Sequence, residues 1–141
     1  MDTKKIIQTL AYLAWKQEGH VMDNMKAYKL MWLADRYHVR QYGRTITGDS
    51  YFALPHGIIP SDAKHLLENN RTKLRLSREY RDAYLAVLPG RRYRAVTQPD
   101  LKAFSDSDQD ALDKVIEKLK AAGAEAISVN GQRIIASARR T

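Results

Sequence analysis

Two carboxylates and two imidazoles lie within a short stretch of this chain, namely Asp35, His38, Asp49 and His56. Carboxylate oxygens and imidazole nitrogens are common ligands of divalent metals, so this set could in principle bind a metal ion. The alternative is structural. The first two residues lie on adjacent turns of one expected helix, where a partly buried carboxylate can pair with Arg36, Arg44 or His56 and fix the following turn. We favour the structural interpretation and expect neither a metal nor a cofactor.

Signatures of catalysis are missing from the sequence. Ser50 and Ser61 lack the glycine-rich elbow of a hydrolase nucleophile. The chain contains neither a Gly-x-x-x-x-Gly-Lys phosphate loop nor a His-Glu-x-x-His zinc helix. Zero cysteines exclude disulfides, thiol nucleophiles and thiolate metal sites together. We therefore expect that the protein is not an enzyme.

The chain has 141 residues, of which 44% are hydrophobic and 28% are charged. This composition suits one globular domain and leaves no room for a second. No apolar run approaches the roughly 18 residues that cross a bilayer, and the N-terminus leads into a periodic helix rather than a secretory leader. We expect a soluble, cytoplasmic protein without membrane contact. The net charge of +8 favours an acidic partner but does not identify it.

Apolar spacing predicts the helices that position these residues. One helix is expected over 4–16, ending near Gly19, and a second over 25–41. Asp23 or Asn24 can cap the start of the second helix, and Gly43 supplies the left-handed residue at its end.

Two later helices follow from capping signals. Pro60 is expected to open a helix that stops near Asn69. Ser105 is expected to cap another, with Asp108 in the reciprocal position of a capping box. That helix should run to about Lys120 and end at Gly123.

Strand signals are shorter. Residues 45–54 read as a turn or hairpin around Gly48-Asp49, and residues 74–88 read either as a strand followed by a helix or as one helix. In residues 91–97, charged side chains alternate with aromatic or β-branched ones, as expected of a strand with one solvent-exposed face. The expected antiparallel partner of this strand is 74–78. The sequence thus predicts a mostly α protein with a small β element (α+β), a compact single-domain helical bundle with short antiparallel hairpins.

Several phrases follow one another in an order that resembles one protein family. They are the run Lys29–His38, the segment Tyr42-Gly43-Arg44, the turn Ile46–Tyr51, the run His56–Ser61 and, more loosely, Phe104–Ile116. Together they resemble the Panacea domain, also called the SocA-like or GepA-like family. The resemblance implies a motif scaffold made of Lys29, Asp35, Arg36, His38, Gly43, Gly48, Asp49, Gly57 and Pro60.

The chain departs from the family pattern in two places. Family members typically read Gly-Pro-Val-Pro where this chain has Gly57-Ile58-Ile59-Pro60, a change that only loosens a turn. The threonine–histidine segment that commonly follows the last helix is missing. In its place we expect a hairpin of 126–129 and 132–135 joined at Asn130-Gly131. The division is therefore a Panacea-like domain over 1–123 and a divergent tail over 124–141 with a disordered end.

The resemblance implies an antitoxin. Members of the family serve mostly in bacterial and phage toxin–antitoxin pairs, neutralise unrelated toxins that include alarmone-synthetase-like enzymes, and in some cases deliver the toxin to a protease. We expect an antitoxin of a type II system that binds a cognate protein toxin directly. The alternatives are a proteolytic adaptor and a small, basic, nucleic-acid-binding regulator, which could be phage-encoded. A homo-oligomer remains open.

Basic residues concentrate between Arg71 and Lys102, where nine Lys or Arg accompany three acids. This stretch could be the solvated face of a strand and a helix, a surface for an acidic protein, or, with Tyr80, Tyr84 and Tyr93 interleaved, a site for phosphates and stacked bases. No helix-turn-helix supports sequence-specific DNA reading.

We expect the toxin to contact the turn from Arg44 to Ile59, with aromatic side chains exposed at its edge, together with the 71–94 region. An interface of roughly 800 Å² per partner is required. The candidate toxin-binding residues are Arg44, Tyr51, Phe52, His56, Arg75, Arg78, Arg92 and Arg94.

Overall fold

A computed structural model describes residues 3–68 and 75–130 of the chain. Its elements, in order, are α1 (Thr3–Trp15), the 3₁₀ turn η1 (Glu18–His20), β1 (Val21–Asp23), α2 (Asn24–Tyr42), β2 (Tyr51–Leu54), β3 (Gly57–Pro60), α3 (Ser61–Glu68), α4 (Arg75–Tyr84), β4 (Leu85–Leu88), β5 (Arg92–Ala95), the 3₁₀ turn η2 (Leu101–Ala103) and α5 (Asp106–Asn130). The predicted α+β fold, mostly helical with short antiparallel pairs, is confirmed.

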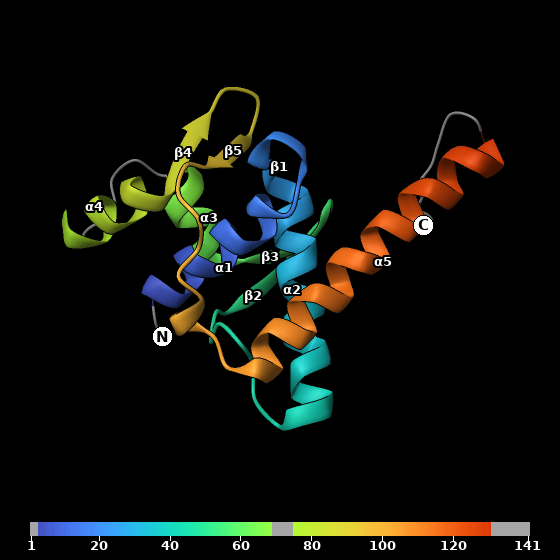
Figure 1. Cartoon of the computed structure of the whole chain (residues 1–141), viewed down its shortest axis with the longest axis horizontal. Coiled ribbons are helices and arrows are strands. Elements are labelled where there is room, and N and C mark those ends of the chain that lie inside the picture. The colour runs from blue at the N-terminus through green and yellow to red at the C-terminus, as the bar shows by residue number, and fades with distance from the viewer. Residues whose placement is uncertain (1–2, 69–74, 131–141) are drawn as a thin grey trace.

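Helix α1 lies at the centre of the fold (Figure 1). Every residue from Ile6 to Ala14 is buried, because α2, α3, α4 and β5 contact the helix from different sides. A helix that is covered all round must also satisfy the polar groups that it buries. Gln8 does so by donating to the Tyr80 hydroxyl at 2.8 Å and accepting from the Asp100 N–H at 2.7 Å.

Two small antiparallel sheets flank this core. The first has the strand order β1-β5-β4, and the second pairs β2 with β3. In β5 the side chains alternate, so that Tyr93 and Ala95 are buried while Arg92 and Arg94 are exposed. Tyr93 is fully buried and donates its hydroxyl to the Leu10 carbonyl at 2.7 Å. The solvent-exposed face predicted for this strand is therefore confirmed.

Helix α5 packs antiparallel against α2 and then slopes away from the body, so that its C-terminal half extends beyond the other helices (Figure 1). The Tyr12 hydroxyl donates to the Asp113 carboxylate at 2.6 Å and ties α5 to α1. Among residues 3–68 and 75–130, no helix has the length and apolar composition needed to span a bilayer.

Both ends of α2 are as predicted. Asp23 accepts from the Lys26 N–H at 3.0 Å, and Gly43 adopts the left-handed conformation with φ of 82°. The hairpin predicted around Gly48-Asp49 is wrong, because these two residues do not form a hairpin turn. The hairpin lies later, where Leu54 pairs with Gly57 across Pro55-His56, since the loop over 43–50 is held against α2 by side chains. Pro60 is the last residue of β3, and the helix predicted to open there is α3, which begins at Ser61 and ends at Glu68.

The predicted strand partner for 91–97 is also wrong. The described residues of 74–78 begin helix α4, residue 74 lies outside the described residues, and β5 pairs instead with β4 and β1. The apolar run 84–88 continues helical spacing in the sequence, which conceals the change from α4 to β4. Neither alternative for 74–88 is right, because a helix over 75–84 is followed by a strand over 85–88.

Helix α5 does not end at Gly123, and residues 126–129 are helical rather than a strand. One glycine costs a helix about 1 kcal/mol relative to alanine, and the alanines around Gly123 favour continuation. The other predicted arm, over 132–135, lies outside the described residues. The division into a domain over 1–123 and a tail over 124–141 stays a prediction.

Candidate functional site

The buried carboxylate of Asp35 on α2 organises the loop over 43–50. Its Oδ1 accepts the N–H groups of Ile46 at 2.7 Å and Thr47 at 3.1 Å. Its Oδ2 accepts the hydroxyls of Thr47 and Tyr51, each at 2.6 Å. A carboxylate that is buried needs such donors, because an unpaired charge is very costly away from water. Asp35 therefore fixes both the loop and the start of β2 on α2.

Asp49 connects the same loop to α3. Its carboxylate accepts the N–H groups of Asp62 at 2.9 Å and Ala63 at 3.0 Å, which are free donors in the first turn of the helix. Burial raises the pKa of the Asp49 carboxyl to about 6, although the hydrogen bonds from Asp62 and Ala63 act in the opposite direction. A loop residue thus caps a helix that begins twelve positions later in the sequence.

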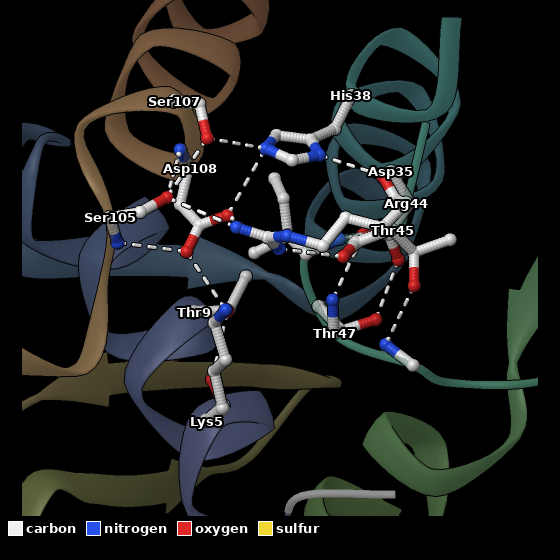
Figure 2. A network of polar contacts seen from close by, with 12 residues as sticks. Lys5, Thr9, Asp35, His38, Arg44, Thr45, Thr47, Ser105, Ser107 and Asp108 are labelled. Atoms are coloured by element: carbon white, nitrogen blue, oxygen red, sulfur yellow. Dashed lines mark hydrogen bonds and ion pairs between the residues drawn. The ribbon is translucent and has the colours of Figure 1, made fainter. Parts of the chain in front are cut away.

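A second polar cluster joins the C-terminal end of α2 to the start of α5 (Figure 2). Ser105 and Asp108 form the predicted capping box: Ser105 N–H donates to Asp108 Oδ2 at 2.9 Å, and Asp108 N–H donates to Ser105 Oγ at 3.1 Å. The buried Asp108 carboxylate also lies 2.8 Å from Lys5 Nζ and 3.1 Å from the Arg44 guanidinium. Burial alone would raise the pKa of Asp108, but the Lys5 ammonium, the Ser105 N–H and Arg44 lower it below its ordinary value.

His38 is fully buried between these groups (Figure 2). Its Nδ1 lies 2.6 Å from the Arg44 carbonyl, which can only accept, so Nδ1 carries the hydrogen. Its Nε2 faces Ser107 Oγ at 2.8 Å and Asp108 Oδ1 at 3.3 Å. The ring therefore links the loop after α2 to the first turn of α5.

The four residues first considered as metal ligands serve separate contacts. Asp35 binds the loop, His38 faces α5, Asp49 caps α3, and His56 is exposed in the turn between β2 and β3. Within the described ranges, no group of three or more His, Asp or Glu side chains is placed to hold a metal ion. The partners expected for Asp35 are wrong, because it accepts from backbone N–H and hydroxyl groups rather than from Arg36, Arg44 or His56.

The hairpin of β2 and β3 carries the exposed part of the predicted turn surface. Phe52 and Leu54 are each 39% exposed and share one face of β2, because alternate residues of a strand point the same way. Tyr51 differs from expectation: it is half-buried and its hydroxyl binds Asp35. Burial and the Asp35 charge raise the Tyr51 pKa, so the phenol remains a donor.

Arg44 does not share a surface with this hairpin. Arg44 lies at the C-terminal end of α2, whose 19 residues span about 28 Å, whereas the hairpin turn lies near the other end. Arg78 is exposed on α4, and Arg92 and Arg94 are exposed on β5. The side chain of Arg75 lies outside the described part of the structure.

Among the described basic side chains between Arg71 and Lys102, Arg81 is buried, whereas Arg78, Arg91, Arg92, Arg94 and Lys102 are exposed. Arg81 is only 7% exposed and donates to the Leu66 carbonyl at 2.8 Å. Tyr93 is buried, and Tyr80 binds Gln8. These contacts leave Tyr93 unavailable for stacking on a base, whereas Tyr80 and Tyr84 are half-buried.

A hollow of about 390 Å³ lies between the amino end of α2 and the β2–β3 turn. We call it the hairpin hollow; its lining includes Met25, Lys26, Lys29, Trp32, His56 and Ile58. The β4–β5 turn approaches the same end of α2, because Asn24 N–H donates to the Arg91 carbonyl at 2.9 Å and Arg92 is paired with Asp23. His56 and Arg92 therefore flank the first turn of α2.

The residues of the implied scaffold fall into two groups. Asp35, His38 and Asp49 are buried in the network, and Gly43 and Gly48 have the left-handed φ values of 82° and 70°. Gly57 also has a positive φ, and Pro60 is buried opposite Tyr51. By contrast, Lys29 is exposed in the hairpin hollow, and exposed Arg36 lies 5.2 Å from the centre of the Trp32 ring.

Sequence reasoning missed several partners in the network. Lys5, Ser107 and Thr47 complete the contacts of Asp108, His38 and Asp35 respectively. Lys5 and Asp108 are far apart in the sequence, and no local pattern signals their contact. Thr47 offered a usable signal, because a Thr-Gly-Asp turn directly after a helix places a hydroxyl where it can reach a carboxylate.

The comparisons with known proteins give one match. A family model described as "Antitoxin SocA-like, Panacea domain" matches residues 28–129. This range includes α2 from Tyr28 onward, the β2–β3 and β4–β5 hairpins and nearly all of α5. No curated protein and no solved structure matches the chain.

Proposed function

Since the chain belongs to the SocA-like antitoxin family with a Panacea domain, we propose that it is the antitoxin of a type II toxin–antitoxin pair and neutralises a cognate protein toxin by binding it directly. The single observation that carries this proposal is the family match over residues 28–129. The antitoxin acts in the cytoplasm through binding free energy alone, and bond-breaking belongs to the toxin.

The use of polar groups in the described network supports binding rather than catalysis. Asp35, His38, Asp49 and Asp108 are all buried, and each is hydrogen-bonded or ion-paired to other groups of the protein. Their geometry explains how the loop over 43–50 and the hairpin are held in place. A catalytic group must instead reach a substrate. The groups left for contact with another molecule are the exposed ones.

We place the toxin-facing surface at the amino end of α2 and on the β2–β3 hairpin. Phe52 and Leu54 offer exposed apolar area on one strand face, and His56 follows in the turn. The hairpin hollow adds Trp32 with Lys26 and Lys29. A buried aromatic centre surrounded by polar residues is the usual arrangement of a specific interface.

The charge of this surface indicates the partner's chemistry. Lys26, Lys29 and Arg92 are exposed around the first turn of α2, so a toxin surface rich in Asp and Glu would be attracted to it. Such complementarity steers association and discriminates against basic partners. It does not fix the toxin's fold or activity.

The experiment is co-expression with the protein encoded by the neighbouring reading frame. If the proposal holds, that protein alone arrests growth, growth returns with the antitoxin, and the toxin persists in an inactive complex. Disappearance of the toxin would instead identify a proteolytic adaptor. Failure to restore growth would contradict both forms of the proposal.

Two variants test whether the hairpin is the contact surface. Phe52→Ala combined with Leu54→Ala should weaken the complex about tenfold or more, because two exposed apolar contacts at an interface centre are removed. Leu101→Ala is the matched control, since Leu101 is 46% exposed on η2, which belongs neither to the hairpin nor to the lining of the hairpin hollow. Equal loss in both variants would contradict the assignment of the surface.

A further inference from the structure

A second hollow lies on the other part of α2, where α5 diverges from it. It has a volume of about 680 Å³ and is bounded by residues 33–41 of α2 and 114–121 of α5. We call it the interhelical groove. Its length along α2 is about 12 Å, or roughly two helical turns. None of its residues belongs to the surface expected from the sequence.

The floor of the groove is apolar. Leu33 is partly buried against the core, Val115 is 5% exposed, and Ala121 extends the floor along α5. Tyr37 crosses between the helices, because its hydroxyl accepts from Lys114 Nζ at 3.0 Å and lies 3.5 Å from the Asp110 carboxylate. The floor is therefore a fixed surface on which apolar side chains can pack.

The rim of the groove is cationic. Arg36, Arg40, Lys114 and Lys118 line it, and Glu117 is the one acid among its lining residues. Arg40 and Lys118 are exposed on opposite helices, and neither forms an ion pair with any residue that the structure describes. Helix α2 itself has one acid, Asp35, which faces the buried loop. Lys114 is paired with Asp110 of α5 at 3.8 Å, so the rim charge offered to a partner comes chiefly from Arg40 and Lys118.

From the apolar floor and the cationic rim we infer that the interhelical groove binds an acidic amphipathic helix of a protein partner. The apolar face of such a helix would pack on Leu33 and Val115, and its carboxylates would face Arg40 and Lys118. Helices commonly dock in grooves between two helices through side chains at i, i+3, i+4 and i+7. The inference rests on the proposed function, under which this helix belongs to the toxin.

Other occupants fit the charges less well. The end of this chain, residues 131–141, carries Arg133, Arg139 and Arg140 without any Asp or Glu, so it would be repelled by the rim. A second copy docking through the same groove would bring two cationic rims together. A nucleic acid would satisfy the rim but would leave the apolar floor without a matching surface.

The inference is tested with a fluorescein-labelled peptide of about four helical turns, with leucines on one face and glutamates on the other. Binding to the full chain is followed by fluorescence anisotropy at physiological ionic strength. A peptide with lysine in place of glutamate and a DNA duplex serve as the other two ligands. The variant Arg40→Glu with Lys118→Glu is compared with Arg78→Glu with Lys102→Glu, which makes the same change in net charge on α4 and η2.

We expect saturable binding of the acidic peptide and a loss of about tenfold or more in the groove variant only, because two favourable charge contacts become repulsive. The basic peptide should bind at least tenfold more weakly. No saturable binding of the acidic peptide, or equal loss in the two variants, would overturn the inference. So would a groove variant that loses DNA binding but keeps peptide binding. Because no toxin is used, these outcomes are independent of growth rescue, which tests the proposed function.

Discussion

Tyr51 at the start of β2 donates its hydroxyl to the Asp35 carboxylate of α2 at 2.6 Å. This bond joins the hairpin to the helix that carries both hollows. Because Phe52 follows Tyr51 directly and points to the opposite side of the strand, the half-buried, hydrogen-bonded tyrosine sets the direction of the exposed phenylalanine. The polar network and the proposed contact surface are therefore parts of one arrangement.

Replacing Tyr51 with phenylalanine should destabilise the protein by about 1–3 kcal/mol, because a buried carboxylate loses one of its four donors. Denaturant unfolding followed by circular dichroism measures the change. Tyr42→Phe is the control, since the Tyr42 hydroxyl binds Asp110 on the exposed surface and its loss should cost under about 0.5 kcal/mol. Equal effects of the two changes would contradict the role given to the Asp35 network.

The Asp49 cap of α3 gives a second prediction. Asp49→Ala leaves the N–H groups of Asp62 and Ala63 without their acceptor and should cost about 1–2 kcal/mol. Asp49→Asn keeps one acceptor oxygen and should cost less. Hydrogen exchange at the first turn of α3 provides the measurement, with faster exchange expected there and little change in α5. Faster exchange throughout the protein would indicate global unfolding instead.

The buried Asp108 carboxylate makes stability depend on pH. Its pKa is lowered below the ordinary value of 3.8 in the folded protein, so folding favours the charged form. That contribution is complete above the unfolded pKa and is lost as the pH falls through the folded pKa. The advantage of the wild type over Asp108→Asn should therefore be constant from about pH 7 to 5 and shrink below about pH 4.

Asp49 acts with the opposite sign, because its folded pKa is raised to about 6. Between pH 3.8 and 6 the folded protein binds more protons than the unfolded one at this residue, so its contribution to stability increases as the pH falls. The comparison of wild type with Asp108→Asn cancels this term, since Asp49 is present in both proteins. An advantage that grows below pH 4 would contradict the assignment for Asp108.

The sequence predicted those features that depend on neighbouring residues. The Asp23 cap, the left-handed Gly43 and the Ser105–Asp108 box are all local contacts, and each is confirmed. Predictions failed where distant residues decide the structure. Asp35 captures the loop over 43–50, and this capture moves the hairpin turn from Gly48-Asp49 to Pro55-His56.

The contact surface was harder to predict for the same reason. The sequence marks Phe52 and His56 as aromatic residues near a turn, and both are exposed. It cannot show that Arg81 is buried against the Leu66 carbonyl, because this contact depends on how α4 packs beside α3. The interhelical groove depends likewise on the angle between α2 and α5, which periodicity within either helix does not encode.

The exposed lysines of the hairpin hollow allow the charge of the proposed surface to be tested separately from its packing. Lys26 lies in the first turn of α2, and Lys29 one turn later. Lys26→Glu with Lys29→Glu should leave folding intact, because negative charge near the start of a helix is favourable. It should slow association with the toxin about tenfold or more at low salt and less at high salt, since exposed charges act mainly on the association rate. Stopped-flow mixing measures the association rate at both salt concentrations.

The control variant, Arg78→Glu with Lys102→Glu, makes the same charge change on α4 and η2, where both residues are exposed. Equal slowing by the two variants would mean that total charge, rather than this end of α2, attracts the toxin.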